Sequence, residues 1–187
     1  MPENVLFVPE CHVDTALTRY LLADRLTFIN HQHGISKVAN VLRQQAESGK
    51  ARFVVGMVDK DKKFADVKYL QPFASSPPVA ARPGPNCRYA IHRHPERLTH
   101  YLIVMEPACD TWIFETAHAA GLELAHFGFP VTLPEFIEVM KDEDIEDKPQ
   151  LIRLLRAIKQ AQPAAYRELA EFVADVMDQN SRLWRQY

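Results

Sequence analysis

The sequence predicts an α/β protein with a mainly parallel central sheet flanked by helices, and with C-terminal helices packed on it. Three observations lead to this prediction. Residues 53–58, F-V-V-G-M-V, are apolar without alternation, which is typical of a central parallel strand that is buried on both faces. Residues 5–8 form a similar apolar run. After residue 130 the composition changes, and apolar residues recur there at helical spacing.

The first third of the chain reads as strand, helix, strand, helix and strand. Asp14 can cap the first of these helices, in which Leu17 and Leu21 recur at helical spacing. Ser36 can cap the second helix and Gly49 can close it. The expected elements are a strand at 5–8, a helix from 14, a short strand at 26–29, a turn at 30–34, a helix from 36 and a strand at 53–58.

A proline-rich stretch separates the two halves of the predicted sheet. Residues 72–85 contain five prolines, so we expect a surface loop, or a lid over the site, and neither a helix nor a central strand. Two strands should follow at 87–94 and 99–105. His92 and His94 share one face of their strand, and we expect them to face solvent on a sheet edge, with a metal pair as the alternative.

The second half of the chain is predicted to be mostly helical. The acidic run at 142–147 should be a solvated loop between two helices. Arg153, Arg156 and Lys159 lie on one helical face and are expected to make ordinary surface pairs. Helices are expected at 110–120, 132–140, 150–159 and 164–177.

Length and composition fit one compact unit. With 187 residues and 47% hydrophobic residues, the chain can bury a core, and we divide it into an α/β domain at 1–130 and a helical extension at 131–187. We expect a cytoplasmic protein, because no apolar run has the length of a membrane span and the three cysteines show no paired spacing. The formal net charge of -2 means that nucleic acid would have to be held by a local basic patch or through a metal ion.

Acidic side chains follow both apolar strands of the first half. Glu10 and Asp14 come after the strand at 5–8, and Asp59 and Asp61 come after the strand at 53–58. If these strands are parallel neighbours, the acids meet at the sheet edge where open α/β sheets bind ligands. Carboxylates repel one another unless a cation is present, and their hard oxygen atoms suit Mg²⁺ or Mn²⁺. The sequence therefore predicts a divalent-metal site.

This arrangement resembles the Toprim domain of topoisomerases, DnaG-type primases, OLD-family nucleases and small RNA-maturation nucleases. The resemblance covers roughly residues 5–62 and implies a Rossmann-like sheet. It implies that Glu10 is a general acid/base or a metal ligand, and that Asp59 and Asp61 form a metal-binding D-x-D pair. Asp14 matches an acid of the primase and OLD-like branches. Cys11 stands where the family usually has glycine.

A second resemblance lies at residues 102–113. Some bacterial Toprim-like proteins of the OLD and RloB type carry a proline after a later strand, and then an acid two residues before a tryptophan. Pro107, Asp110 and Trp112 match this pattern, with aspartate in place of the more usual glutamate. The resemblance implies that Asp110 completes the acidic site and that Trp112 anchors its helix.

These features together predict a divalent-metal-dependent phosphodiester hydrolase, a nuclease of the kind found in bacterial defence or RNA maturation. Mg²⁺ or Mn²⁺ would be the cofactor, and Glu10 would move a proton or bind a second ion. Lys60 and Lys62 would offset charge on the phosphate. His31, His33 and Lys63 are the expected substrate contacts. The expected metal ligands are Glu10, Asp14, Asp59, Asp61 and Asp110.

Two alternatives stay open at this point. The chain could be a non-catalytic Toprim-like module that binds or regulates, for example with a partner ATPase, and Cys11 and the mild net acidity favour this. The other alternative is a transition-metal enzyme built on histidines, since imidazole binds Zn²⁺ and iron. The eight histidines are scattered along the sequence, which weighs against that second alternative.

Overall fold

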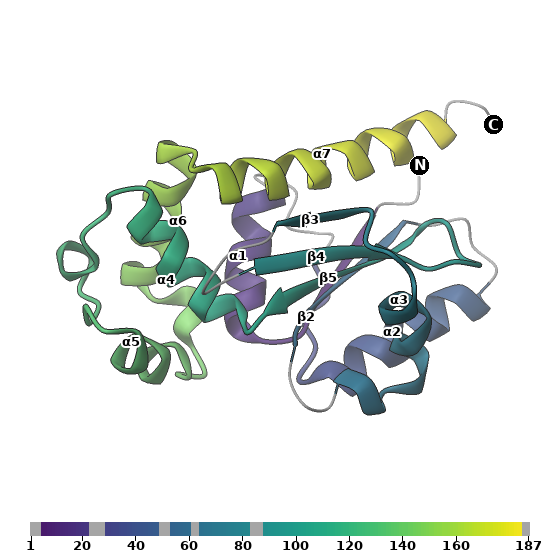
Figure 1. Ribbon diagram of the computed structural model, residues 1–187, viewed down its shortest axis with the longest axis horizontal. Helices are drawn as coiled ribbons and strands as arrows, with labels where there is room; N and C mark the ends of the chain where they lie inside the picture. The colour runs from purple at the N-terminus through teal and green to yellow at the C-terminus, as the bar shows by residue number, and fades with distance from the viewer. Residues whose placement is uncertain (1–4, 23–28, 49–52, 61–63, 83–87, 185–187) are drawn as a thin grey trace.

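The structure is a computed structural model that describes residues 5–22, 29–48, 53–60, 64–82 and 88–184, with side chains described only as far as residue 179 (Figure 1). In these residues five strands form one sheet in the order β1-β2-β5-β4-β3. The strands are β1 Leu6–Pro9, β2 Val54–Asp59, β3 Ala80–Arg82, β4 Arg88–Arg93 and β5 His100–Glu106.

The sheet is mixed, and its parallel part is the part that carries the predicted site. Strand β1 pairs with β2 in parallel, and β2 pairs with β5 in parallel. Strands β4 and β3 add to the other side of β5 in antiparallel fashion, because short connections allow each strand to turn back on its neighbour. The predicted parallel pairing of the strands at 5–8 and 53–58 is therefore confirmed, whereas the β3–β4 half of the sheet is antiparallel.

Helices cover both faces of the sheet. The longer helices are α1 His12–Leu22, α2 Ile35–Glu47, α4 Cys109–Ala119, α5 Leu133–Met140, α6 Pro149–Ala161 and α7 Ala164–Trp184. The short ones are α3 Gln71–Ser75 and the 3-10 turns η2 Phe64–Asp66, η3 Lys68–Leu70, η4 Leu124–Phe127 and η5 Ile145–Asp147. None of the helices in the described ranges is long and apolar enough to cross a membrane.

The proline-rich stretch is more ordered than predicted. Pro72 lies in the first turn of α3, where proline is tolerated because its missing N–H would have no partner inside the helix. Phe73 on this helix is fully buried. Residues 80–82 then form the edge strand β3. The prediction of a loop throughout 72–85 is therefore wrong for these two segments, and residues 83–85 lie outside the described residues.

The side chains of the central strands alternate between two hydrophobic clusters, which explains their continuous apolar sequence. Val55 and Met57 point to a large cluster formed with α1 and α4 to α7. Val54 and Val58 point to a smaller cluster formed with α2 and α3. Figure 1 shows α2 and α3 on one side of the sheet, and α1, α4, α6 and α7 on the other. The C-terminal helices pack on the α/β part, as predicted.

Gly56 allows α2 to approach the sheet closely. A Cβ atom at this position would lie 2.9 Å from Cδ1 of Leu102, 3.1 Å from Cδ1 of Leu42 and 3.2 Å from Cγ1 of Val38. These distances are shorter than ordinary van der Waals contact. The glycine in the middle of β2 is therefore explained by helix packing, and this packing sets the position of the segment that precedes α2.

Helix α1 connects the α/β part to the C-terminal helices. The hydroxyl of Tyr20 donates a hydrogen bond to the carbonyl of Ile152 in α6, at 3.1 Å. The hydroxyl of Tyr166 in α7 donates to the carbonyl of Tyr20, also at 3.1 Å. Nη1 of Arg19 lies 2.9 Å from a carboxylate oxygen of Asp147 in η5. Residues far apart in sequence thus hold α1 in place.

Candidate functional site at the carboxyl ends of the parallel strands

Three predicted acids meet at the carboxyl ends of β1, β2 and β5. Glu10 directly follows β1, and its Oε2 accepts a hydrogen bond of 3.2 Å from the backbone N–H of Asp59, the last residue of β2. Oδ1 of Asp59 in turn accepts a hydrogen bond of 2.8 Å from the N–H of Cys109, the first residue of α4. Asp110 follows in the same first turn, close enough for its charge to raise the pKa of Asp59. The predicted meeting of Glu10 and Asp59 at the sheet edge is therefore present, and Asp110 lies near Asp59.

Asp14 has a structural role that explains one of its two carboxylate oxygen atoms. Helix α1 begins at His12, so Asp14 is the third residue of its first turn and does not precede the helix as predicted. Oδ2 of Asp14 accepts from the N–H of Cys11 at 3.2 Å, and the N–H of Asp14 donates to Sγ of Cys11 at 3.5 Å. This reciprocal pair is a capping box with cysteine in the place of serine or threonine.

The second oxygen atom of Asp14 has no such explanation. The side chain is fully buried, and Oδ1 has no hydrogen-bond partner among the described residues. A buried carboxylate oxygen without a partner is unfavourable, because it has lost its hydration and gained nothing in return. The thiol of Cys109 lies near this carboxylate and acts to lower its pKa, but a thiol is a weak donor and a cation would be a stronger partner for the oxygen.

Burial and crowding favour the neutral forms of Asp59 and Asp14. Burial raises the pKa of Asp59 to about 9, and the charges of Asp14, Glu10 and Asp110 add to this effect. Burial also raises the pKa of Asp14 to about 7, with a further contribution from Glu10. Both shifts have the physical cause expected for carboxylates that share a poorly solvated space, and a bound cation would favour their charged forms.

Of the predicted basic residues Lys60, Lys62 and Lys63, the structure describes Lys60, which pairs with an acid of β5. Nζ of Lys60 lies 3.0 Å from Oε2 of Glu106 at the end of β5, and the same carboxylate pairs with Arg88 at 2.6 Å. Lys60 is therefore engaged on the neighbouring strand and is not a free cation beside the acids. Asp61, Lys62 and Lys63 lie outside the described residues, as do most of the strand predicted at 26–29 and the helix end predicted at Gly49.

A second group of side chains lies beside the acids, on the outer side of β1. Ile29 forms a parallel bridge with Phe7 in β1, and the chain continues along that strand. The N–H groups of Asn30, Gln32 and Gly34 donate to the carbonyls of Phe7, Pro9 and Glu10, at distances of 2.8, 2.9 and 3.2 Å. Gly34 then precedes α2 with a φ of 106°, so this glycine caps the helix in place of the predicted Ser36.

This pairing brings His31 and His33 against His12, the first residue of α1. The ring centroids are 4.5 Å apart for His12 and His31, 4.6 Å for His31 and His33, and 5.6 Å for His12 and His33. One ligand atom from each ring lies within 4.8 Å of the other two. Burial lowers the pKa of His31, and the neighbouring His12 adds to this shift. Three of the histidines that looked scattered in sequence are therefore clustered in space.

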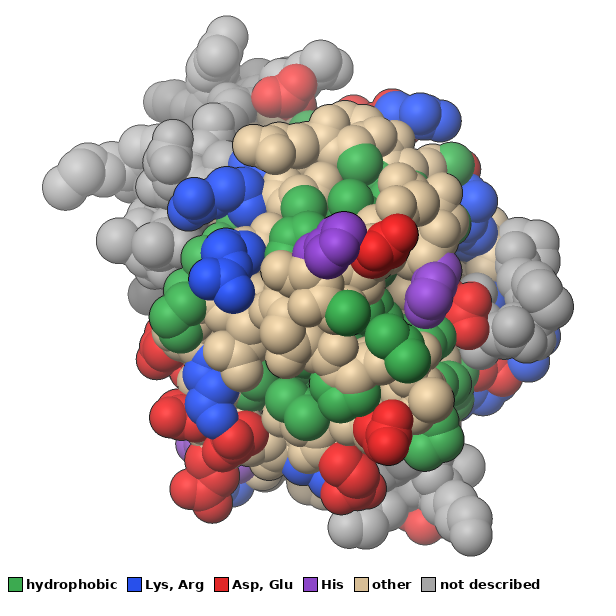
Figure 2. All heavy atoms as spheres, turned by 90° about the vertical axis from the view of Figure 1, so that its left-hand side faces the viewer, with side chains coloured by type: hydrophobic (Ala, Val, Ile, Leu, Met, Phe, Trp, Pro, Cys, Tyr) green, Lys and Arg blue, Asp and Glu red, His purple; other side chains and the backbone are tan. Residues whose placement is uncertain are grey.

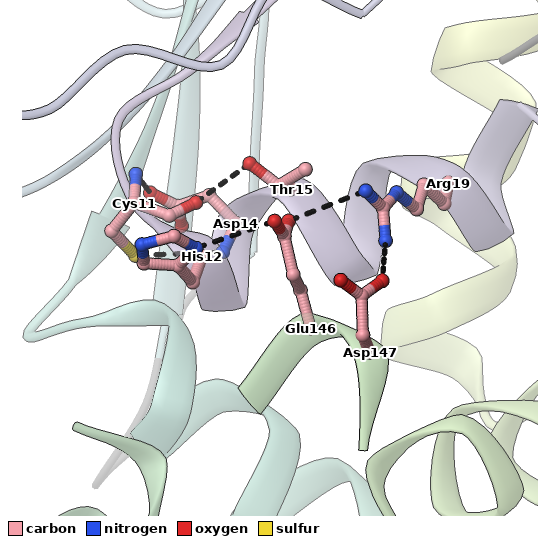
Figure 3. A network of polar contacts seen from close by, with 7 residues as sticks. All are labelled: Cys11, His12, Asp14, Thr15, Arg19, Glu146 and Asp147. Atoms are coloured by element: carbon pink, nitrogen blue, oxygen red, sulfur yellow. Dashed lines mark hydrogen bonds and ion pairs between the residues drawn. The ribbon is translucent and has the colours of Figure 1, made fainter. Parts of the chain in front are cut away.

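The carboxylate of Glu146 completes this group. It lies in η5, between His12 and Arg19, as Figure 3 shows, with Oε1 3.3 Å from Nδ1 of His12 and Oε2 3.5 Å from Nη2 of Arg19. Its side chain is only 13% exposed, so the prediction of a fully solvated loop at 142–147 is wrong at this residue. His12 and Glu146 were not among the predicted site residues, and for Glu146 the sequence contains no local signal.

The other predicted histidine pair is structural. His94 is buried, and its ring packs on Phe73 with the ring centroids 5.0 Å apart, while Nδ1 accepts from the N–H of Glu96 at 3.1 Å. Nδ1 of His92 lies 3.1 Å from the carbonyl oxygen of Ser76. The prediction that both face solvent is wrong for His94. The ring of His94 also borders a surface pocket of about 630 Å³ between α2 and η3. None of the acids of the candidate site, Glu10, Asp14, Asp59 and Asp110, lines this pocket.

The end of the molecule formed by α4, α5 and α6 carries interspersed charges. On the face shown in Figure 2, Lys and Arg side chains lie along the edges, two of them close together at the left, while the centre of the face carries hydrophobic, acidic and histidine side chains. Acids and bases pair locally near this end, for example Glu138 with Lys141 at 2.5 Å and Glu123 with His126 at 3.2 Å. The described residues of this face therefore offer no continuous basic surface to a polyanion.

Comparisons of this chain with family models, with curated proteins and with solved structures found no match. The Toprim-like resemblance therefore stays a prediction.

Proposed function

We propose that this protein is a divalent-metal-dependent phosphodiester hydrolase that acts on nucleic acid, with its site at the carboxyl ends of β1, β2 and β5. The observation that carries the proposal is the fully buried Asp14, whose Oδ1 has no hydrogen-bond partner among the described residues and which lies beside Glu10 and Asp59. A cation held by these carboxylates would offset both their desolvation and their mutual repulsion.

The chemistry of the ligand atoms suits Mg²⁺ or Mn²⁺. Asp14, Asp59 and Glu10 offer carboxylate oxygen atoms, which are the ligands that hard divalent cations prefer. Asp110 lies next to them, and Asp61 follows Asp59 after one residue in the sequence. When bound, such an ion supplies charge stabilisation on a phosphate oxygen and lowers the pKa of a bound water molecule.

The side chains of this chain would then orient the reactants and move the proton. Glu10 would accept a proton from the attacking water, and the N–H of Asp59 at 3.2 Å holds its carboxylate in position. The first turn of α4 lies at the same edge, where the N–H groups of Cys109 and Thr111 donate to Asp59 and Asp110, and the positive end of the helix favours the charged forms of these carboxylates. Lys60 would contribute positive charge from its position beside Glu106.

The test is cleavage of single- and double-stranded DNA and RNA in Mg²⁺ or Mn²⁺, comparing the wild type with Glu10→Gln and Asp59→Asn. We expect both variants to lose activity by more than the roughly 10–100-fold that is typical of losing an outer-shell partner of a metal. Glu123→Gln is the matched control, because Glu123 is an exposed acid, with 74% of its side chain exposed, and is not one of the proposed site residues. Cleavage by both variants at the wild-type rate would contradict the proposal.

A second candidate is a non-catalytic binding or regulatory module of the same fold. The engagement of Lys60 by Glu106 and the lack of a continuous basic surface on the face of Figure 2 favour it. Calorimetry separates the two candidates: Mg²⁺ binding that is weakened in Asp59→Asn, in a protein that cleaves none of the four substrates, would support the regulatory module.

A further inference from the structure

The histidine cluster has the composition and the spacing of a metal-binding site, and it is distinct from the acidic cluster. Its three imidazoles come from the start of α1 and from the segment that pairs with β1. Backbone hydrogen bonds fix both segments, so the cluster does not depend on flexible side chains of one exposed loop. Zn–N bonds of about 2.0–2.1 Å place tetrahedral ligand atoms about 3.3 Å apart, so small side-chain rotations from within 4.8 Å would complete the site.

One buried nitrogen atom of this cluster has no partner. Nε2 of His31 has no hydrogen-bond partner among the described residues, whereas Nδ1 of His12 and Oε2 of Glu146 face Glu146 and Arg19 in ion pairs. A buried polar atom without a partner is unfavourable, because it has lost its hydration. A bound ion would give this nitrogen a partner and would also account for three imidazole rings gathered in one place.

We infer that His12, His31 and His33 form a second metal centre, which takes a transition-metal ion of the Zn²⁺ class and not Mg²⁺. Imidazole nitrogen is a ligand for zinc, copper, iron and nickel, whereas magnesium takes oxygen ligands and keeps several water molecules. Three protein ligands is also the number in zinc sites that keep one position open for water or substrate. This centre goes beyond the hydrolase proposal and does not depend on it.

Glu146 is assigned as the residue that positions His12. A carboxylate beside Nδ1 of a histidine fixes the tautomer in which Nε2 binds the ion, and such pairs are common around zinc. Arg19 holds the Glu146 carboxylate from the other side, at 3.5 Å, and its guanidinium also contacts Asp147 at 2.9 Å, as Figure 3 shows. The second centre therefore connects α1, the segment at 29–34 and η5.

The test is Zn²⁺ binding by the full chain in the absence of nucleic acid, measured by calorimetry and by metal content after dialysis. We expect one Zn²⁺ per chain that excess Mg²⁺ does not displace. The double variant His31→Asn/His33→Asn should weaken binding at least about 100-fold, and Glu146→Gln should weaken it about 10–100-fold, as expected for an outer-shell partner. Co²⁺ should give the visible absorption of a four-coordinate site in the wild type and not in the double variant.

Two controls keep this result separate from folding and from the acidic site. His126→Asn removes an exposed histidine and should bind Zn²⁺ like the wild type, and circular dichroism should show that every variant is folded. Glu10→Gln/Asp59→Asn should keep Zn²⁺ binding while it loses the Mg²⁺-dependent activity. The inference is overturned if the wild type binds no Zn²⁺, or if Zn²⁺ binding follows the acidic variants and not the histidine variants.

Discussion

Burial acts in opposite directions on the pKa values of two polar side chains of the core. It raises the pKa of Asp14 to about 7 and lowers the pKa of His100 to about 4, in each case favouring the neutral form. Asp14 lies in the acidic cluster at the carboxyl ends of the parallel strands. His100 is the first residue of β5 and therefore lies at the amino end of that strand. His100 is only 2% exposed, and its Nδ1 has no hydrogen-bond partner among the described residues. The titration of His100 therefore affects the free energy of unfolding without involving the acidic cluster.

We expect the contribution of His100 to stability to fall in mild acid, while the raised pKa values of Asp14 and Asp59 act in the opposite direction over the same range. Its pKa is about 6.5 in the unfolded chain and about 4 in the native state, so between these values the unfolded chain binds more protons. The contribution is fully present above pH 6.5 and is lost as the pH falls towards 4. We expect a contribution of about 2–3 kcal/mol. The difference in unfolding free energy in urea between the wild type and His100→Gln should change between pH 6.5 and 4, with the wild type losing more on acidification, whereas the difference for His126→Gln should stay constant; a constant difference for His100→Gln would contradict this.

At the scale of elements, the contact between α2 and β2 depends on the absence of a side chain at Gly56. Gly56→Ala should destabilise the protein by about 1–2 kcal/mol, because the overpacking outweighs the smaller loss of chain entropy on folding. Gly56→Val should cost more. The measurement is urea unfolding. Leu102→Val in the Gly56→Ala background should recover part of the loss, since Cδ1 of Leu102 is the nearest atom. Unchanged stability of Gly56→Ala would show that α2 is not held this closely.

The arrangement of the elements also shows which parts of the site could be predicted from the sequence. The acids were predictable, because strand type and strand ends are local features, and parallel neighbours bring their carboxyl ends together. The histidine cluster was not predictable, since it depends on the pairing of residues 29–34 with β1 and on the docking of η5 against α1. His94 was predicted to face solvent because the buried packing of Phe73 lies in a stretch that looked like a loop. Contacts between distant segments, not local propensity, decided these cases.

At the scale of the whole molecule, η5, α6 and α7 cover one face of α1. Helices α6 and α7 contribute Leu155, Ile158 and Leu169 to the same hydrophobic cluster as Leu17 of α1. The two hydroxyl hydrogen bonds of Tyr20 and Tyr166 cross the same boundary. The described contacts therefore favour one cooperative unit over an independent α/β domain with an appendage.

Removal of residues 131–187 should therefore prevent stable folding of residues 1–130. The apolar face of α1 and the adjoining face of the sheet would be exposed to water, at a cost of about 25 cal/mol for each Å². We expect the fragment to lack a cooperative urea transition by far-UV circular dichroism, and the full chain to show one transition. A fragment that unfolds cooperatively, with a stability close to that of the full chain, would contradict this view.

The position of α1 also has a consequence for synthesis in the cell. Helix α1 is synthesised well before its partners η5, α6 and α7, which lie far later in the chain. These contacts cannot form until α6 and α7 have been synthesised, so the face of α1 that they cover stays exposed while the intervening residues are made. The nascent chain should therefore depend on chaperones to shield this helix until its C-terminal partners emerge.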